Sequence, residues 1–169
     1  MADIDEAQWI AWYQSLEKPL YNVAYRWLWD AAESQDVVQE AFLRCWRIRD
    51  RIEPDTFKAL IYRTTLRLAS NRVRRRKLWR FVSFAGSDRD AGEQGDDDVL
   101  AAGALRRALA GVAEPLRQVL VLSELVGLSY KEIAEIMRIT EGTVGSRRHR
   151  AIAELKTRLR AMGVRWNEN

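Results

Sequence analysis

The chain of 169 residues is long enough for one domain or two small ones, and a hydrophobic fraction of 47% excludes wholesale disorder. The single cysteine, Cys45, excludes an internal disulfide, and the single histidine, His149, leaves no Cys/His ligand set for a metal site. The formal net charge of +4 says little by itself about a polyanionic partner, so the distribution of charge along the chain matters more.

The sequence shows no secretory signal and no membrane-spanning segment. The first residues are acidic and lack the basic start and apolar core of a secretory signal. No apolar run approaches the ~20 residues that a membrane helix needs. We therefore expect a cytoplasmic protein without membrane insertion.

A first helical block is predicted from about Glu6 to Arg80. Apolar residues recur at helical spacing in two stretches, which are Trp9, Ile10, Tyr13, Leu16 and Leu20, then Val37, Val38, Ala41, Phe42, Cys45 and Trp46. Pro54 predicts a loop over Asp50–Thr56, and the helical pattern resumes at Phe57.

A break follows over Ser83–Val99, which holds three glycines and six carboxylates against one arginine. This composition is typical of a flexible linker. A second helical block is predicted from Leu100 to about Met162, interrupted at Pro115, at Gly127 and around residues 138–142. The predicted fold class is all-α: two small helical domains joined by a flexible acidic linker, the C-terminal one containing a helix-turn-helix.

The helix-turn-helix is predicted over Ser129–Leu155. Ser129 is a plausible N-cap, and Glu132 three residues later completes a capping box. A tight turn over residues 138–140 precedes a second helix, whose stretch Gly142–Arg160 carries six Lys/Arg against one Glu. Such a helix can enter the major groove of DNA, although a surface helix with solvated charges is the alternative interpretation.

Three segments of the chain resemble parts of extracytoplasmic-function (ECF) RNA polymerase sigma factors. Residues 115–159 (PLRQVLVLSELVGLSYKEIAEIMRITEGTVGSRRHRAIAELKTRL) resemble the family's fourth region. Residues 34–47 (SQDVVQEAFLRCWR) resemble its second region, and residues 57–77 (FKALIYRTTLRLASNRVRRRK) resemble the adjoining segment that melts and reads the minus-ten promoter element. The order of these segments and the acidic linker between them also match.

The resemblance implies a bacterial alternative sigma factor, a non-catalytic specificity subunit that binds core RNA polymerase, directs it to promoters and helps melt the minus-ten region. It divides the chain into a region 2-like domain (1–80), an acidic linker (81–100), a region 4-like domain (101–163) and a tail (164–169). The implied contacts with the coiled coil of the polymerase β′ subunit are Asp36, Gln39, Glu40 and Leu43. Without the surrounding motif, these residues would be read as an ordinary solvated face.

The segment Arg63–Arg80 contains eight basic residues and no acidic one, a density that repels itself unless a polyanion is present. The resemblance implies that minus-ten DNA is bound by Ile52, Arg63, Arg67, Asn71, Arg74, Arg75, Arg76 and Lys77. Ile52 is a candidate wall of the pocket for an extruded base. A solvated or generic RNA-binding run remains the alternative for Arg72–Lys77.

In the second domain, the positions that match the family's minus-thirty-five contacts are Thr143, Ser146, Arg147, His149 and Arg150. The resemblance also implies docking on the polymerase β flap and restraint by an anti-sigma factor, for which exposed tryptophans of the first domain are a hypothetical surface. The linker resembles a connector that threads toward the polymerase active-site channel, with a passive tether as the alternative. No cofactor, metal ion or small-molecule substrate is expected.

The chain departs from the family pattern at four positions. Gly145 stands where a lysine or arginine is usual, and Leu60 replaces a common tryptophan. Arg67 and Asn71 replace a frequent asparagine and a frequent aspartate. These changes leave the expected fold intact but bear on which promoter is read.

Two other functions compete with this interpretation. A stand-alone helix-turn-helix regulator would bind duplex DNA by itself, with the first block as a sensor or dimerisation domain. The third possibility, an enzyme, has no support in the sequence, which shows no nucleophile–base pair, no metal ligand set and no glycine-rich phosphate loop.

Overall fold

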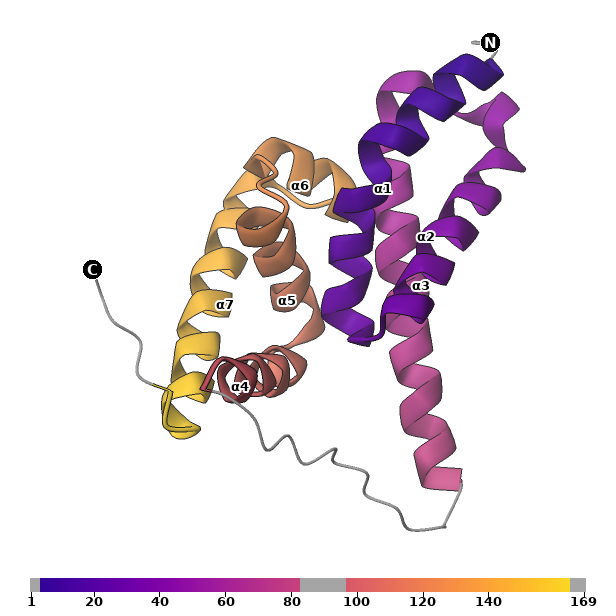
Figure 1. Cartoon of the computed structure of the whole chain (residues 1–169). Coiled ribbons are helices and arrows are strands. Elements are labelled where there is room, and N and C mark those ends of the chain that lie inside the picture. Colours follow the sequence, from indigo (N-terminus) through magenta and orange to yellow (C-terminus); the bar gives the residue numbers. More distant parts are fainter. Residues whose placement is uncertain (1–3, 83–96, 165–169) are drawn as a thin grey trace.

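The computed structural model describes residues 4–82 and 97–164, with side chains described for 4–79 and 102–164. Within these ranges the chain forms seven α-helices, one 3₁₀ turn and one π-helical turn, and no strand. Two groups of helices lie side by side (Figure 1). The predicted all-α class with two small helical domains is confirmed, while the predicted linker falls mostly on residues outside the described ranges.

The N-terminal domain consists of α1 (Glu6–Leu28), α2 (Ala31–Trp46), the 3₁₀ turn η1 (Arg49–Arg51) and α3 (Pro54–Val82). Aspartates cap the first two helices: Asp5 accepts from the backbone N–H of Gln8 at 2.7 Å, and Asp30 accepts from that of Glu33 at 2.8 Å. Trp29 closes α1 in the left-handed conformation with φ 52°, which allows the chain to reverse into α2.

The C-terminal domain consists of α4 (Asp97–Gly111), α5 (Glu114–Leu120), the π-helical turn η2 (Val121–Leu125), α6 (Tyr130–Met137) and α7 (Glu141–Ala161). The predicted capping box at the start of α6 is present, since Ser129 and Glu132 each accept a hydrogen bond from the other's backbone N–H. Arg138 adopts φ 56° between α6 and α7, and Thr140 caps α7. The predicted helix-turn-helix is therefore confirmed.

One sequence-based prediction of local structure needs correction. The loop expected over Asp50–Thr56 is shorter, because Pro54 begins α3, a position where its missing N–H costs no helical hydrogen bond. Near the end of the predicted linker, α4 begins at Asp97. Ile10, one of the apolar residues at helical spacing in α1, is 48% exposed.

One large apolar cluster spans both domains. Buried side chains of the N-terminal domain, such as Leu20, Ile61 and Tyr62, form one cluster with Leu122 and Ile136 of the C-terminal domain. Aromatic rings close the outer end of this cluster. The rings of Trp12 and Phe57 stack with centroids 4.0 Å apart, and Trp9 contacts both Phe42 and Trp46 edge-on.

Polar contacts between the domains surround this shared core. Lys58 Nζ of α3 donates to Glu132 Oε1 of α6 at 2.6 Å. The guanidinium of Arg63 donates from Nε to the carbonyl of Ile136 at 3.0 Å and from Nη2 to that of Glu135 at 3.3 Å. Because the last carbonyls of a helix lack intrahelical partners, Arg63 satisfies groups at the end of α6 that would otherwise need water.

The contact between Lys58 and Glu132 predicts a loss of stability in acid. Hydrogen bonds from Lys58 and from Ser129 lower the pKa of Glu132 from 4.5 to about 2. The unfolded chain therefore takes up this proton first, so the contribution of Glu132 is present above pH 4.5 and is lost as the pH falls toward 2. We expect Glu132→Gln to flatten the decline of the unfolding free energy below that pH, measured by urea denaturation at several pH values.

Glu135→Gln is the matched control, because the carboxylate of Glu135 makes no hydrogen bond or ion pair in the described part of the chain. An equal flattening in both variants would contradict the assignment of the acid sensitivity to Glu132.

Candidate nucleic-acid and protein interfaces

Helix α7 presents the side chains predicted to read DNA on its outer face. Val144 and Ala151 are fully buried and orient the helix, while Ser146, His149 and Arg150 are exposed and Arg147 is half-buried. The helix lies on the side of the molecule away from α2 and α3 (Figure 1). Its first half is therefore open to a large partner.

Thr143 and Arg148 of α7 have contacts within the protein. Thr143 donates its backbone N–H to Thr140 Oγ1 at 3.2 Å, and the two hydroxyl oxygens lie 2.9 Å apart, so Thr143 helps to form the cap. Arg148 Nε donates to Glu124 Oε1 at 2.6 Å, and this hydrogen bond lowers the pKa of Glu124. Arg148 thereby ties α7 to the π-helical turn η2.

Gly145 occupies the position where the family pattern has a basic residue. A Cβ atom at Gly145 would meet Cε2 of the Tyr130 ring at 3.4 Å, which is an ordinary contact distance. The helix thus has room for a small side chain at this position. The glycine therefore differs from the family pattern in lacking the positive charge that a lysine or arginine would carry there.

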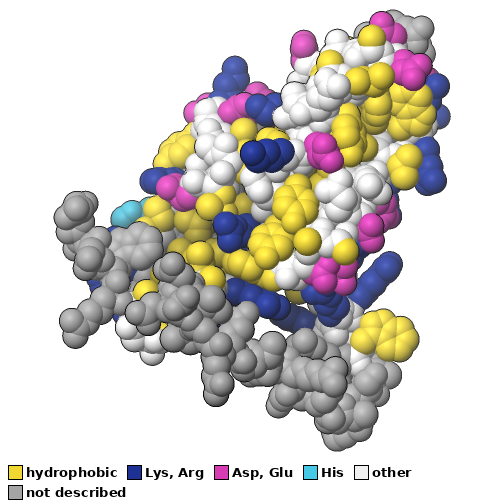
Figure 2. Space-filling view, in the orientation of Figure 1, with side chains coloured by type: hydrophobic (Ala, Val, Ile, Leu, Met, Phe, Trp, Pro, Cys, Tyr) yellow, Lys and Arg dark blue, Asp and Glu magenta, His cyan; other side chains and the backbone are white. Residues whose placement is uncertain are grey.

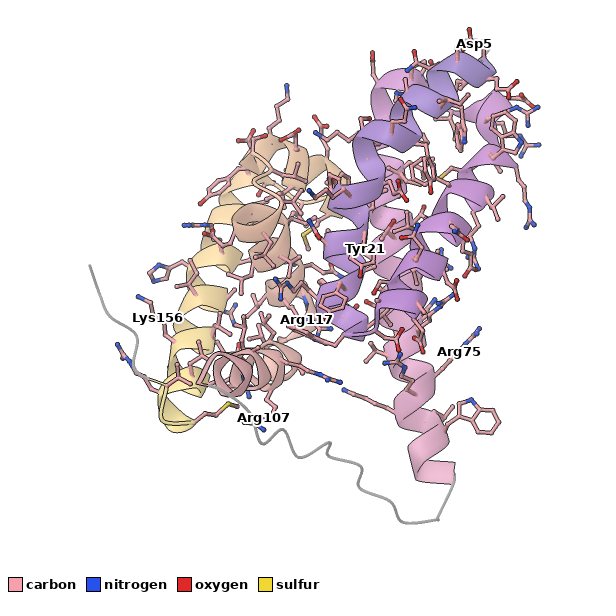
Figure 3. The ribbon with its side chains drawn as sticks, viewed as in Figure 1. Asp5, Tyr21, Arg75, Arg107, Arg117 and Lys156 are labelled. Atoms are coloured by element: carbon pink, nitrogen blue, oxygen red, sulfur yellow. The ribbon has the colours of Figure 1, made fainter. Side chains whose placement is uncertain are left out.

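The basic segment of α3 is divided between exposed and paired side chains. Figure 1 shows the C-terminal part of α3 extending past α1 and α2, and Arg75 points away from the C-terminal domain in Figure 3. Asn71 is half-buried on the same helix. The exposed members of the predicted minus-ten set on this helix are Arg67, Arg74, Arg75 and Lys77.

Arg72 and Arg76 of this segment are bound within the fold. Arg72 donates to the carbonyl of Glu33 at 3.0 Å and to Glu40 Oε2 at 3.3 Å, and it lies 4.0 Å from Asp36 Oδ2. Arg76 donates to the carbonyl of Leu28 at 3.1 Å and pairs with Glu33. Carboxylates of α2 therefore relieve part of the repulsion that the sequence predicted for this run.

Arg63 and Ile52 differ from the sequence interpretation. Arg63 is held by the carbonyls at the end of α6, and burial lowers the pKa of its guanidinium. Ile52 is only 5% exposed and packs in the core at the start of α3, so it forms no open pocket wall in this conformation. An aliphatic side chain between η1 and α3 is drawn inward by the hydrophobic effect.

The predicted polymerase contacts on α2 lie along one helical face, at positions 36, 39, 40 and 43. The side chain of Asp36 is 66% exposed, Gln39 is exposed, and Leu43 is 57% exposed. Glu40 is partly engaged, because it accepts from Arg44 at 2.6 Å and from Arg72 at 3.3 Å. The face thus combines exposed acidic and amide groups with an exposed leucine.

An apolar groove beside this face was missed by the sequence analysis. It runs between α1 and α2 and is lined by Trp9, Ile10, Phe42 and Leu43, among others. The sequence did contain a signal for this groove: Ile10 directly follows Trp9, so the apolar stripe of α1 is wider than one buried face requires. Trp79 was also missed as a surface residue: it is 68% exposed, beside Leu78 at 64%, whereas Trp9, Trp12, Trp27 and Trp29 are buried or half-buried.

Membrane-spanning helices and metal-ligand clusters are both absent from the described residues. No helix of residues 4–82 or 97–164 is long and apolar enough to cross a membrane. No group of three or more His, Cys, Asp or Glu side chains in these ranges is arranged to hold a metal ion.

Two family models match the chain, one on each domain. The model "Sigma-70 region 2" matches residues 12–78, and "Sigma-70, region 4" matches residues 102–155. The first match covers α2 and most of α3, and the second covers the helix-turn-helix. This arrangement defines a sigma factor of the sigma-70 class.

Individual relatives identify the family within this class. The ECF RNA polymerase sigma factor SigL of Mycobacterium tuberculosis is 35% identical over 162 residues, which is 91% of this chain and 90% of the relative. SigE of Mycolicibacterium smegmatis is 33% identical over 144 residues, 81% of this chain but 56% of that longer protein. The chain belongs to the ECF family of RNA polymerase sigma factors, a family of promoter-recognising subunits, as the sequence motifs predicted.

Solved structures agree on the fold. The complex of CnrH with the cytosolic domain of CnrY gives a TM-score of 0.70 at 24% identity, covering 93% of this chain and 90% of the other. The sigma factor RpoE in complex with the anti-sigma factor NepR from Bartonella quintana gives a TM-score of 0.63 at 23% identity. The match covers 89% of this chain and 97% of the other.

The environment of Gly145 predicts that a methyl group there is stabilising. Alanine favours a helix interior over glycine by ~1 kcal/mol, and the Tyr130 ring leaves room for Cβ, so we expect Gly145→Ala to raise the unfolding free energy by up to ~1 kcal/mol in urea denaturation. Gly127→Ala is the control, because φ is +76° there and a side chain would be strained. A similar loss of stability in both variants would contradict this account.

Proposed function

We propose that this chain docks on core RNA polymerase through α2 and directs the enzyme to promoters through α3 and α7. In this proposal α3 binds the minus-ten element and helps to hold it open, and α7 reads the minus-thirty-five element. The protein is a non-catalytic subunit that works where the polymerase works, in the cytoplasm. Its domains correspond to residues 1–80 and 101–163, joined by 81–100.

The observation that carries the proposal is the separation of three surfaces on one chain. Exposed cations follow α3 and α7, while α2 offers an acidic and apolar face whose one cation, Arg44, is paired with Glu40. A helix with exposed basic residues near its N-terminus suits the major groove. The two basic surfaces belong to different domains, so a single promoter could be held at two points.

The α2 face suits a protein partner better than DNA. The carboxylate of Asp36 would repel phosphates, and Leu43 with the adjoining groove supplies the apolar contact that protein interfaces concentrate at their centre. We assign this face to the coiled coil of the polymerase β′ subunit. Docking of the C-terminal domain on the β flap completes the proposed attachment.

An anti-sigma factor is proposed as a further partner. Both solved relatives of this fold described above are complexes, one of them with a protein named as an anti-sigma factor. The exposed pair Leu78–Trp79 at the end of α3 is an apolar surface on the first domain that such a partner could cover.

Transcription in vitro with core polymerase on a genomic DNA library tests the proposed function directly, and it would reveal promoter use and promoter sequence together. We expect promoter-specific transcripts only when the chain is added to core enzyme. Tight footprinting of a specific duplex by the chain alone would instead support a stand-alone helix-turn-helix regulator.

Charge reversal on α2 tests the polymerase face. We expect Asp36→Lys to weaken binding to core polymerase by about tenfold, as loss and reversal of a charged contact at an interface would do. The measurement is fluorescence anisotropy of the labelled full chain titrated with core enzyme.

Glu53→Lys is the control for this variant, since Glu53 is an exposed carboxylate that lies outside α2. Unchanged affinity in Asp36→Lys, with circular dichroism like that of the parent, would remove this face from the proposal.

Truncation on α7 tests the minus-thirty-five assignment. We expect Arg150→Ala to reduce transcription from a promoter by about tenfold while leaving core binding unchanged, because a base or phosphate contact is worth roughly 1–3 kcal/mol. Arg107→Ala on α4 removes an exposed arginine outside α7 and serves as the control. Parallel losses of core binding and transcription in Arg150→Ala would indicate a folding defect and contradict the assignment.

A further inference from the structure

A cavity of about 360 Å³ lies between the two domains. Its walls come from the end of α1, from α3, and from α4 and α5 of the other domain. Figure 2 shows dark-blue Lys and Arg side chains gathered where α4 approaches α3. The cavity is at the small end of the range of roughly 300–1,000 Å³ that is typical of ligand pockets.

The lining of this cavity is strongly basic. Glu114 is its one carboxylate among the described residues, and it accepts hydrogen bonds from Ser70 and from Gln118. The cationic residues that line the cavity are Arg74, Arg76, Lys77, Arg106 and Arg117. Five cations against one carboxylate in a small space repel one another unless an anion is bound.

Most of these cations have no acidic partner. Arg76 pairs with Glu33, but the other four cations hydrogen-bond to no carboxylate in the described part of the chain. Arg106 lies 6.0 Å from the ring centre of Trp29, a contact that orients its guanidinium without neutralising it.

Arg117 is the most unusual member of the set. Only 8% of the residue is exposed, its Nε has no hydrogen-bond partner, and its guanidinium stacks 4.4 Å from the ring centre of Trp27. Figure 3 shows Arg117 reaching from α5 toward α1. Burial lowers the pKa of this guanidinium, and Glu114 nearby opposes that shift. A buried arginine without a hydrogen-bonded anion is costly, which points to a missing partner.

We propose that this cavity binds a small polyphosphate anion, with two or three linked phosphate groups, which bridges α3 of one domain and α4 and α5 of the other. Arginine suits phosphate because its planar donors match the geometry of phosphate oxygens, and stacking on Trp27 holds Arg117 in place. Several cations around one small volume suit an anion with more than one charge.

Binding at this place has a consequence that rests on the proposed function. Arg74, Arg76 and Lys77 belong to the set assigned to minus-ten DNA, so the anion and the promoter would compete for them. Because the anion contacts both domains, it would also favour the arrangement in which they are packed together. By linkage, DNA would weaken anion binding by the same factor as the anion weakens DNA binding.

Calorimetric titration of the full chain with sodium tripolyphosphate, at matched ionic strength, tests the site. We expect saturable binding with one anion per chain and about tenfold weaker affinity in Arg106→Gln, since one charge-assisted hydrogen bond is lost. Arg107→Gln is the matched control, because Arg107 is the next residue of α4 and does not line the cavity. It should change the affinity less than twofold.

A second pair of variants keeps the test decisive if Arg106→Gln fails to fold. Arg74 lines the cavity and Arg75 does not, so Arg74→Gln should weaken tripolyphosphate binding while Arg75→Gln should not. Absence of saturable binding, or equal losses in lining and control variants, would overturn the proposal, because either result would leave only the general basic field of the protein.

A separate titration with short single-stranded oligo(dT) distinguishes free polyphosphate from the phosphates of a DNA strand. If oligo(dT) binding depended on Arg106 while tripolyphosphate did not bind, the cations would serve the DNA backbone and the proposed site would be overturned. Transcription with core polymerase in the absence of added anion tests the sigma-factor function independently, so failure of one proposal does not imply failure of the other.

Discussion

The apolar contact between the two domains is the constraint on which the rest of the structure depends. Leu122, Ile133 and Ile136 of the C-terminal domain are completely or almost completely buried in the same cluster as Leu20 and Ile61 of the N-terminal domain. This contact places the end of α6 against α3, where Arg63 and Lys58 bind it. It also brings α4 and α5 toward the end of α1, which creates the basic cavity, and it leaves the basic face of α7 exposed.

Electrostatic pairing between α2 and α3 determines which cations are available to a partner. Glu33 and Glu40 of α2 bind Arg76 and Arg72, so the helix proposed to dock on polymerase and the helix proposed to bind the minus-ten element are joined by charge. These pairs are half-exposed, so each adds little to stability by itself. Their larger effect is on geometry, because they hold two arginines in place beside the exposed cations of the same helix.

The sequence predicted the features that depend on local chemistry. The capping box at Ser129 needs only a partner three residues away, and the turn before Thr140 follows from short-range backbone preferences, so both were found. The destination of Arg63 and the exposure of Ile10 depend on helices that pack from elsewhere in the chain, which no short-range pattern encodes. The early start of α3 at Pro54 lies between these cases, since proline suits both a loop and the first turn of a helix.

The shared core also has a consequence for the way in which the molecule unfolds. Two domains with separate cores can melt independently, but here the removal of one domain would expose apolar side chains of the other to water. All-or-none unfolding is typical of single domains, and the shared cluster makes the two domains equivalent to one in this respect. Calorimetric and van't Hoff enthalpies of unfolding are therefore expected to agree, so that the two domains behave as one thermodynamic unit although they carry different recognition surfaces.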